Sequence, residues 1–357
     1  MNQKKDKHHF ISQFYLRGFA TPTKQQNKDS PHLTNVLDVK RARQFRANVR
    51  DVAFQKYFNR LENYKEHANE LEDSLMVIEG RLSNSIEQLS NSKTVDEGLA
   101  DALVNLMALF GSRTPMGRER IKSHTKSVED AVHYALGNFP HMSENRSDGV
   151  TFDMLNQAYR DGEMKNGEYT QDQLIQTEFV LVRDLVRDLH KRTWHLLDCA
   201  ACSSKFITSD NPVVLCHREK GLINLHFTGS AVLDKRAVIY FPVTSTLALY
   251  GVLDGSEAPV VNEYTVSNLN TWMVNNGCRQ IFYKEKNFNV VDANGEAQTD
   301  EDVFRVVKRL LEDELKNQSK EQDATLGILT TMNKDDFRVM NVQDVIAMLE
   351  SEASRPK

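Results

Sequence analysis

The sequence predicts an α+β fold in which a helical N-terminal half packs on a mixed or antiparallel C-terminal sheet, with further helices at the C-terminus. The first observation is the helical spacing of apolar residues in long segments between residues 61 and 192. The second is a change after residue 193 to short β-favouring runs separated by turn signals. Helical spacing returns beyond residue 299. Helices and strands segregated in this way favour the α+β class.

The individual elements follow from periodicity and from capping signals. Helices are predicted over residues 61–89, 95–112, 116–137, 170–192, 260–276 and 342–349, and after the capping box that begins at Thr299. Pro115 suits the first position of its helix. Residues 137–149, rich in Gly, Asn, Pro and Ser, predict a loop. Strands are predicted over residues 35–39, 193–197, 205–208, 213–216, 237–241, 247–252 and 280–283.

These elements suggest three parts of the chain. Residues 1–192 form a mainly helical part, and residues 193–321 form a sheet-containing part that we expect to fold with it as one cooperative domain. Residues 322–357 form a short helical tail. A chain of 357 residues is long enough to bury a large core.

Composition limits the functional classes. The net charge of −5 and the pI of about 6.1 argue against a protein that binds nucleic acid through its overall charge, so such binding requires a local basic patch. No apolar run approaches the roughly 18 residues of a membrane span. The charged first residues lack the apolar region of a signal peptide, so we expect a cytoplasmic protein.

An aromatic and basic stretch at residues 7–19 organises the chain. We predict an extended segment to residue 11, then a short helix with Ser12 as its N-cap. Phe10, Phe14 and Phe19 have no local apolar partners. The stretch should therefore pack against the C-terminal sheet.

Several stretches carry a family resemblance. The opening His-His-Phe-Ile-x-x-Phe-Tyr-Leu-Arg-x-Phe, the Arg-Thr-Pro at residues 113–115 and the Ser-Asp-Asn-Pro turn at residues 209–212 resemble the mainly bacterial family catalogued as domain of unknown function 4238. Residues 206–208, 241–244 and 268–282 resemble it too. The family usually has proline where this chain has Ser12. The resemblance implies a shared fold and a shared site, without an established chemistry.

The paired histidines are the first candidate catalytic residues. Adjacent side chains on an extended segment point to opposite faces, so one site can use only His8 or His9 directly. With Arg17 one turn inside the helix, either histidine suits acid/base chemistry on an anion such as phosphate, and Tyr15 is a further binding candidate. The alternative is that both histidines form hydrogen bonds that hold the N-terminal segment in place.

The turn Ser209-Asp210-Asn211-Pro212 is the second candidate. Asp210 should project from the end of the sheet, where it can act as a general base or as a ligand for a divalent metal ion, with Ser209 and Asn211 as binding residues. The alternative is an Asx-turn in which these side chains cap local backbone amides.

Other polar residues have similar double interpretations. Arg113, at the end of an apolar helix, can hold phosphate or simply interact with the helix dipole. Glu178 is a weaker ligand candidate. Trp194 and Tyr57 are expected in the core or in a pocket wall rather than as base-stacking platforms.

A basic run and a cysteine group complete the candidates. The run comprises Lys40, Arg41, Arg43, Arg46 and Arg50. It suits a phosphate-facing patch or a solvated face. The cysteine group comprises Cys199, Cys202, Cys216 and the adjacent His217. Its spacing permits zinc, but β-favouring, apolar surroundings favour core cysteines.

Taken together, these residues predict a phosphodiester hydrolase, nuclease-like, in a prokaryotic defence or toxin setting. His8 or His9 would be the acid/base and Asp210 a base or metal ligand. Arg17 and Arg113 would hold phosphate, and the basic run would contact nucleic acid. The alternative is a non-catalytic module that binds a protein or a ligand through the same groove.

Overall fold

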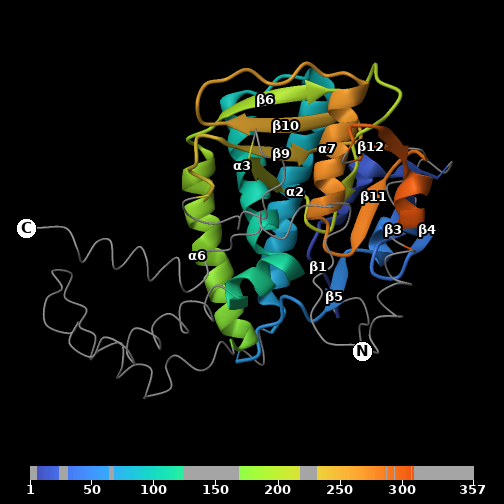
Figure 1. Ribbon diagram of the computed structural model, residues 1–357. Coiled ribbons are helices and arrows are strands. Elements are labelled where there is room, and N and C mark those ends of the chain that lie inside the picture. The colour runs from blue at the N-terminus through green and yellow to red at the C-terminus, as the bar shows by residue number, and fades with distance from the viewer. Residues whose placement is uncertain are drawn as a thin grey trace, which may run out of the picture.

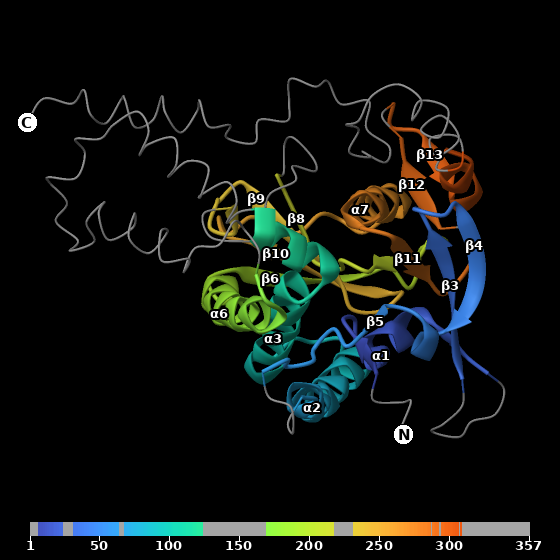
Figure 2. The ribbon, with the colours of Figure 1, turned by 90° about the horizontal axis from the view of Figure 1, so that it is seen from below.

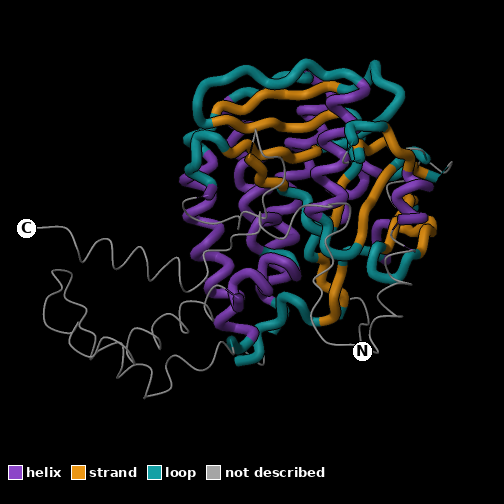
Figure 3. Tube along the Cα trace, in the orientation of Figure 1, coloured by secondary structure: helices purple, strands orange, loops and turns teal. Residues whose placement is uncertain are grey.

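The computed structural model describes residues 6–23, 31–63, 68–123, 169–217, 231–286, 288–292, 294–306 and 308. Helices and antiparallel strands are both present, as the α+β class requires (Figure 3). The predicted division into a helical N-terminal half and a C-terminal sheet is not seen, because strands also occur near the N-terminus. These strands are β1 (Lys7–His9), β2 (Thr21–Pro22), β3 (His32–Asp38), β4 (Arg43–Asn48) and β5 (Phe54–Lys56).

One sheet joins the two halves of the chain. Its strands run in the order β2-β3-β11-β7, and β4 pairs with β3. Strand β11 (Gln280–Tyr283) lies antiparallel between β3 and the two-residue β7 (Thr208–Ser209). Because β3 and β11 are far apart in the sequence, local pattern does not predict their pairing.

A second, four-stranded antiparallel sheet lies at the centre of the hydrophobic core. Its order is β6 (Thr193–Asp198), β10 (Leu247–Val252), β9 (Ala237–Pro242) and β8 (Val214–His217). Alternate residues of β9 face two different clusters: Ile239 and Phe241 belong to one, Val238 and Tyr240 to the other. Both faces are buried, which explains why this strand is continuously apolar.

Three long helices pack together on one side of this sheet (Figures 1 and 2). They are α2 (Glu70–Ser92), α3 (Glu97–Ser112) and α6 (Gln171–Leu189). Helix α2 begins nine residues later than predicted. Asp96 caps α3, and Thr170 forms a capping box at α6. Residues 115–123 are also helical, which agrees with Pro115 as a first helical residue.

The second core cluster is covered by α7 (Glu263–Asn276), which Asn262 caps. A small hairpin of β12 (Asn289–Val291) and β13 (Ala297–Thr299) packs beside it. The capping box predicted at Thr299 is present, since the side chains of Thr299 and Asp302 each accept from the other's backbone amide.

The N-terminal segment lies against the C-terminal part of the chain, as predicted. Strand β1 pairs with β5, and the short helices α1 (Gln13–Leu16) and η2 (Arg17–Phe19) follow. Tyr15 stacks on Phe241 with ring centroids 5.4 Å apart. The amide of Ser245 donates to the carbonyl of Gly18. A Cβ atom on Gly18 would lie only 3.0 Å from the carbonyl oxygen of Val243. The close approach favours glycine at this position.

Some predicted elements lie outside the described residues. They are the loop over residues 137–149, most of the helix over residues 116–137 and the tail over residues 322–357. Among the helices that the structure describes, none is long and apolar enough to cross a membrane.

Candidate functional site

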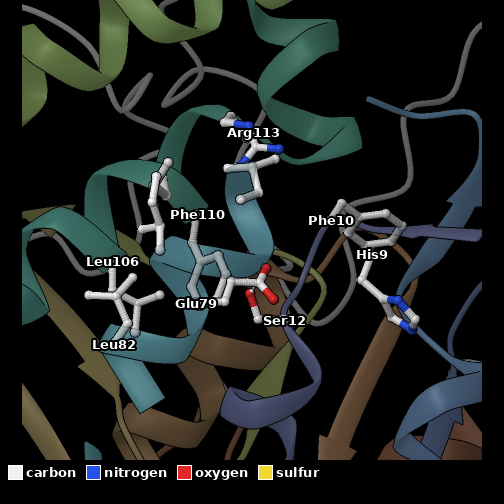
Figure 4. A pocket seen from close by; sticks show the side chains of 11 residues that line it. His9, Phe10, Ser12, Glu79, Leu82, Leu106, Phe110 and Arg113 are labelled. Carbon is white, nitrogen blue, oxygen red and sulfur yellow. Dashed lines mark hydrogen bonds between the residues drawn. The ribbon is translucent and has the colours of Figure 1, made fainter. Parts of the chain in front are cut away.

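A small pocket lies where the N-terminal segment meets α2 and α3 (Figure 4). It is lined by His9, Phe10, Ser12, Leu75, Ile78, Glu79, Leu82, Leu106, Leu109, Phe110 and Arg113. The space open to the centre of a water molecule is about 10 Å³, room for roughly one water. The lining therefore includes three ionisable residues among mainly apolar ones.

Glu79 and Ser12 meet at the middle of the view in Figure 4, Arg113 lies above them, and the ring of His9 lies to one side and points away. The hydroxyl of Ser12 donates to Oε1 of Glu79 over 2.6 Å. Burial raises the pKa of Glu79, and the like charge of Glu72 adds to this, whereas the Ser12 hydrogen bond and Arg113 oppose it. Ser12 does precede α1, but its side chain binds Glu79 instead of capping the helix.

Asn59 connects three groups around the pocket. Its Oδ1 accepts from Nη2 of Arg113 over 3.0 Å, and its Nδ2 donates to Oε2 of Glu72 over 2.6 Å. Its backbone amide donates to Nδ1 of His8 over 2.9 Å. Because Asn59 is fully buried and makes all three bonds, it sets the positions of side chains from β1, α2 and the end of α3.

The two histidines have different surroundings. His8 is fully buried, and since its Nδ1 accepts a hydrogen bond, the ring proton belongs on Nε2. The 3.8 Å approach of this Nδ1 to Glu72 is therefore not an ion pair. His9 lines the pocket, and burial lowers its pKa to about 4, although the backbone of Arg50 opposes this. His9 is thus a neutral imidazole at neutral pH.

Arg113 is 7% exposed, and its Nε has no hydrogen-bond partner within the described residues. Burial lowers its pKa, and the nearby Glu178 and Glu79 oppose this effect. Glu178 itself is engaged by Arg118, whose Nε and Nη2 both donate to its carboxylate. We therefore assign Glu178 to a buried ion pair rather than to a ligand site.

The Ser209–Pro212 turn lies outside the pocket, and backbone amides donate to both carboxylate oxygens of its Asp210. Asp210 accepts from the amides of Cys278, Arg279 and Gln280 over 2.8, 3.2 and 3.1 Å. Burial raises its pKa to about 6, against these three hydrogen bonds. Asp210 is not among the residues that line the pocket. The structure thus brings His9 and Arg113 together but not Asp210.

Asn211 and Ser209 also hold the chain in this turn. The Asn211 side chain donates to the carbonyl of Asn276, and the Asn276 side chain donates back to the carbonyl of Asn211 over 2.6 Å. The hydroxyl of Ser209 accepts from the amide of Asn211. The bonds between Asn211 and Asn276 fasten the end of α7 to β7 and join residues 65 positions apart. The Asx-turn alternative expects local capping, and within the described residues of this turn only the bond between Ser209 and Asn211 is local.

The remaining aromatic and basic candidates are core or surface residues. Tyr15 is fully buried, and its hydroxyl bonds to Thr208 and to the carbonyl of Pro242, both over 2.7 Å. Arg17 is exposed and does not line the pocket. Trp194 packs on Gly251, where a Cβ would lie 2.5 Å from its ring. Tyr57 is 39% exposed, beside Arg60.

The basic run is spread over several surfaces. Arg43 and Arg46 lie on β4, opposite Asp38 and Asn35 of β3. Since side chains alternate along a strand, Arg43 and Arg46 point to opposite faces. Lys40, Arg41 and Arg50 are exposed beyond the strand ends. Within the described residues β4 pairs only with β3, and charged side chains on such an edge also discourage pairing between molecules.

The cysteines are distributed around the second core cluster. Cys199 and Cys216 are buried within it, and Cys202 packs against it. The part of the chain that the structure describes contains no group of three or more His, Cys, Asp or Glu side chains placed to hold a metal ion.

Sequence reasoning missed Glu79, Glu72 and Asn59. A signal for the glutamates was present, because Glu72 and Glu79 are seven residues apart and so lie on the same side of α2. Glu79 also falls between Leu75 and Leu82, which form the buried stripe of that helix. A carboxylate within an apolar stripe needs a compensating partner. No comparable local signal marks Asn59.

Comparison with known proteins gives one match. The family model described as "Protein of unknown function (DUF4238)" matches residues 7–287. That range includes the N-terminal segment, the pocket and the Asp210 turn. No curated protein and no solved structure gives a significant match.

Proposed function

The chain belongs to the DUF4238 family, and from the residues of its pocket we propose that it is a nuclease-like phosphodiester hydrolase with Glu79 as its proton acceptor. The observation that carries this proposal is the convergence of Glu79, Arg113 and His9 in one pocket. A carboxylate with a pKa raised by burial is a suitable general base near neutral pH. A guanidinium with an unused N–H is a suitable donor to a phosphoryl oxygen.

In this proposal the surrounding residues position these two groups. Asn59 holds Nη2 of Arg113 and leaves Nε for a substrate oxygen. Ser12 orients Glu79 through Oε1. Asp210 takes no part, because backbone amides occupy both of its oxygens. His9 contributes as a neutral wall residue rather than as an acid.

The basic run is the proposed nucleic-acid contact. Arg41, Arg43, Arg46 and Arg50 are all exposed. Contacts from such side chains to phosphates would guide nucleic acid without reading its sequence. A role in prokaryotic defence or as a toxin belongs to the same proposal, and growth arrest on expression, relieved by Glu79→Gln, would support it.

A non-catalytic binding module is the second candidate, and two observations favour it. Glu72, Glu79 and Glu178 lie within electrostatic reach of Arg113 and compete with an anionic ligand. The free space of about 10 Å³ admits a single substrate atom, such as one oxygen, rather than a whole phosphate group.

Purified full-length protein tests the catalytic proposal on mixed RNA and DNA, with EDTA or with added Mg²⁺. We expect cleavage, and a loss of roughly 100-fold or more in Arg113→Lys, since lysine cannot reproduce the fixed fork of donors. Arg81→Lys, on the exposed face of α2, is the matched control and should retain full activity. Absence of cleavage under every condition would reject the hydrolase and leave the binding module.

A further inference from the structure

Building on the proposed hydrolase, we infer that the substrate is RNA and that its own 2′-hydroxyl, deprotonated by Glu79, is the nucleophile. Among the residues that line the pocket, Glu79 serves here as the proton acceptor and Arg113 as the cationic donor. A phosphodiester that carries its nucleophile within the same molecule needs little more, because intramolecular attack avoids the entropic cost of placing a separate water.

The contact between Ser12 and Glu79 shows that the carboxylate can accept a hydrogen bond from an alcohol. The hydroxyl of Ser12 lies 2.6 Å from Oε1, the distance of a strong charge-assisted hydrogen bond. Within the described residues no group donates to Oε2 of the same carboxylate. Because a ribose 2′-hydroxyl is also an alcohol, Oε2 can bind it in the way that Oε1 binds Ser12.

Arg113 supplies the complementary charge. Its guanidinium is anchored at Nη2 by Asn59, and its buried Nε has no partner among the described residues. Both Arg113 and Glu79 line the same pocket. An N–H held there can donate to a non-bridging oxygen of the phosphate while the 2′-oxygen attacks, and so stabilise the charge that develops on that oxygen.

The pocket has room for one of the two substrate oxygens that Glu79 and Arg113 would bind, so binding of both requires the pocket to widen. About 10 Å³ is open to the centre of a water molecule, which matches one hydroxyl or one phosphoryl oxygen. The ribose and the base would remain outside the pocket, beside Ile78, a lining residue that is 39% exposed.

The reaction balances without an oxidant or a reductant. The bond from the 2′-oxygen to phosphorus forms, and the bond from phosphorus to the 5′-oxygen breaks. The 2′-hydroxyl proton passes to Glu79, and the leaving 5′-oxygen takes a proton from water. The products are a 2′,3′-cyclic phosphate and a free 5′-hydroxyl, and Glu79 returns its proton to solvent.

Three oligonucleotides of one sequence test this inference: RNA, DNA and RNA with 2′-O-methyl groups. Each is incubated with full-length protein, in EDTA and in Mg²⁺, and the ends are identified by mass spectrometry. We expect RNA to be cut to 2′,3′-cyclic phosphate ends, and the other two to be cut at least about 100-fold more slowly.

The other outcomes separate the two proposals. Cleavage of DNA or of the 2′-O-methyl RNA at the rate of RNA, or RNA products that lack a cyclic phosphate, would overturn the 2′-hydroxyl mechanism and leave phosphodiester hydrolysis in place. Cleavage of none of the three would overturn both.

Discussion

Two carboxylates, the buried Asp210 and the half-buried Glu79, lie in different regions of the molecule and have different kinds of partner. Asp210, in the β7 turn, accepts three backbone amides. Glu79, on α2, accepts one side-chain hydroxyl and faces a pocket that also contains Arg113. Burial raises the pKa of both groups. A raised pKa therefore does not distinguish a functional carboxylate from a structural one.

The partners do distinguish them. Backbone amides are fixed by the fold, so a carboxylate that they saturate has no capacity left for a ligand and serves to hold the chain. A carboxylate held through one oxygen keeps the other for chemistry. The turn at Asp210 fastens α7 to the β11 sheet, whereas Glu79 lies where two chain segments leave a small space.

The largest expected effect comes from the segment that contacts both regions. Ser12 binds Glu79, and the hydroxyl of Tyr15 binds Thr208, two residues before Asp210. Deleting residues 1–19 removes four fully buried apolar side chains, Ile11, Tyr15, Leu16 and Phe19. At roughly 1.5–3 kcal/mol for each side chain, the loss is comparable with the whole stability of a typical domain.

We therefore expect the deletion to abolish the cooperative thermal transition in calorimetry. The milder Tyr15→Phe, which loses two hydrogen bonds but keeps the ring, should lower the free energy of unfolding by about 1–3 kcal/mol. A truncated protein that melts at the same temperature as the full chain would show that the segment is not part of the core.

The second prediction tests Glu79 as the proton acceptor of the pocket. Glu79→Gln keeps the shape and an oxygen for Ser12 but removes the proton acceptor. It should lower the rate of RNA cleavage by about 10²–10⁴-fold and leave the melting temperature nearly unchanged. Glu87→Gln, exposed on the same helix, is the control and should cleave at the wild-type rate. Wild-type activity in Glu79→Gln would remove Glu79 from the mechanism.

The third prediction uses the sign of the pH dependence. The pKa of His9 is lowered to about 4 from 6.5, so the native state binds fewer protons than the unfolded state between these values. The stability that His9 contributes is present above pH 6.5 and is lost as the pH falls to 4, by up to about 3 kcal/mol. His9→Gln should therefore gain stability relative to wild type on acidification, measured by urea unfolding at several pH values.

The pKa of Asp210, raised to about 6 from 3.8, has the opposite effect. The native state binds the extra proton, so this contribution is present below pH 3.8 and is lost as the pH rises through 6. In Asp210→Asn this dependence should disappear. The difference in unfolding free energy between His9→Gln and wild type should therefore change with pH in the opposite direction to the difference between Asp210→Asn and wild type. The same direction for both variants would contradict the contrast between pocket and turn.

The smallest expected effect is on the turn itself at neutral pH. In Asp210→Asn the side-chain NH₂ replaces one acceptor and faces a backbone donor, which should cost about 1–3 kcal/mol in the free energy of unfolding. Cleavage per folded molecule should stay at the wild-type level, and Glu257→Gln, in an exposed loop, should change neither quantity. Loss of cleavage in a folded Asp210→Asn protein would restore Asp210 as the catalytic carboxylate.

Local patterns predicted most of the elements and part of the candidate site. The helical spacing of α6 and the apolar runs of β8 to β10 agree with the structure. His9 and Arg113 were selected for chemistry, and both line the pocket. Strand β4 was missed, because Arg43-Gln44-Phe45-Arg46 has no clear alternation and its pairing with β3 makes it a strand.

The sequence by itself determined the α+β class, the periodic helices, the capping box at Thr299 and the family, because these depend on residues close together along the chain. Only the tertiary structure decided which polar side chains meet. Ser12 and Glu79 are 67 residues apart, and Asn59 and Arg113 are 54 apart. Such contacts depend on how α2, α3 and the N-terminal segment pack around one another. A buried polar group must find a partner there, but no local spacing says which one.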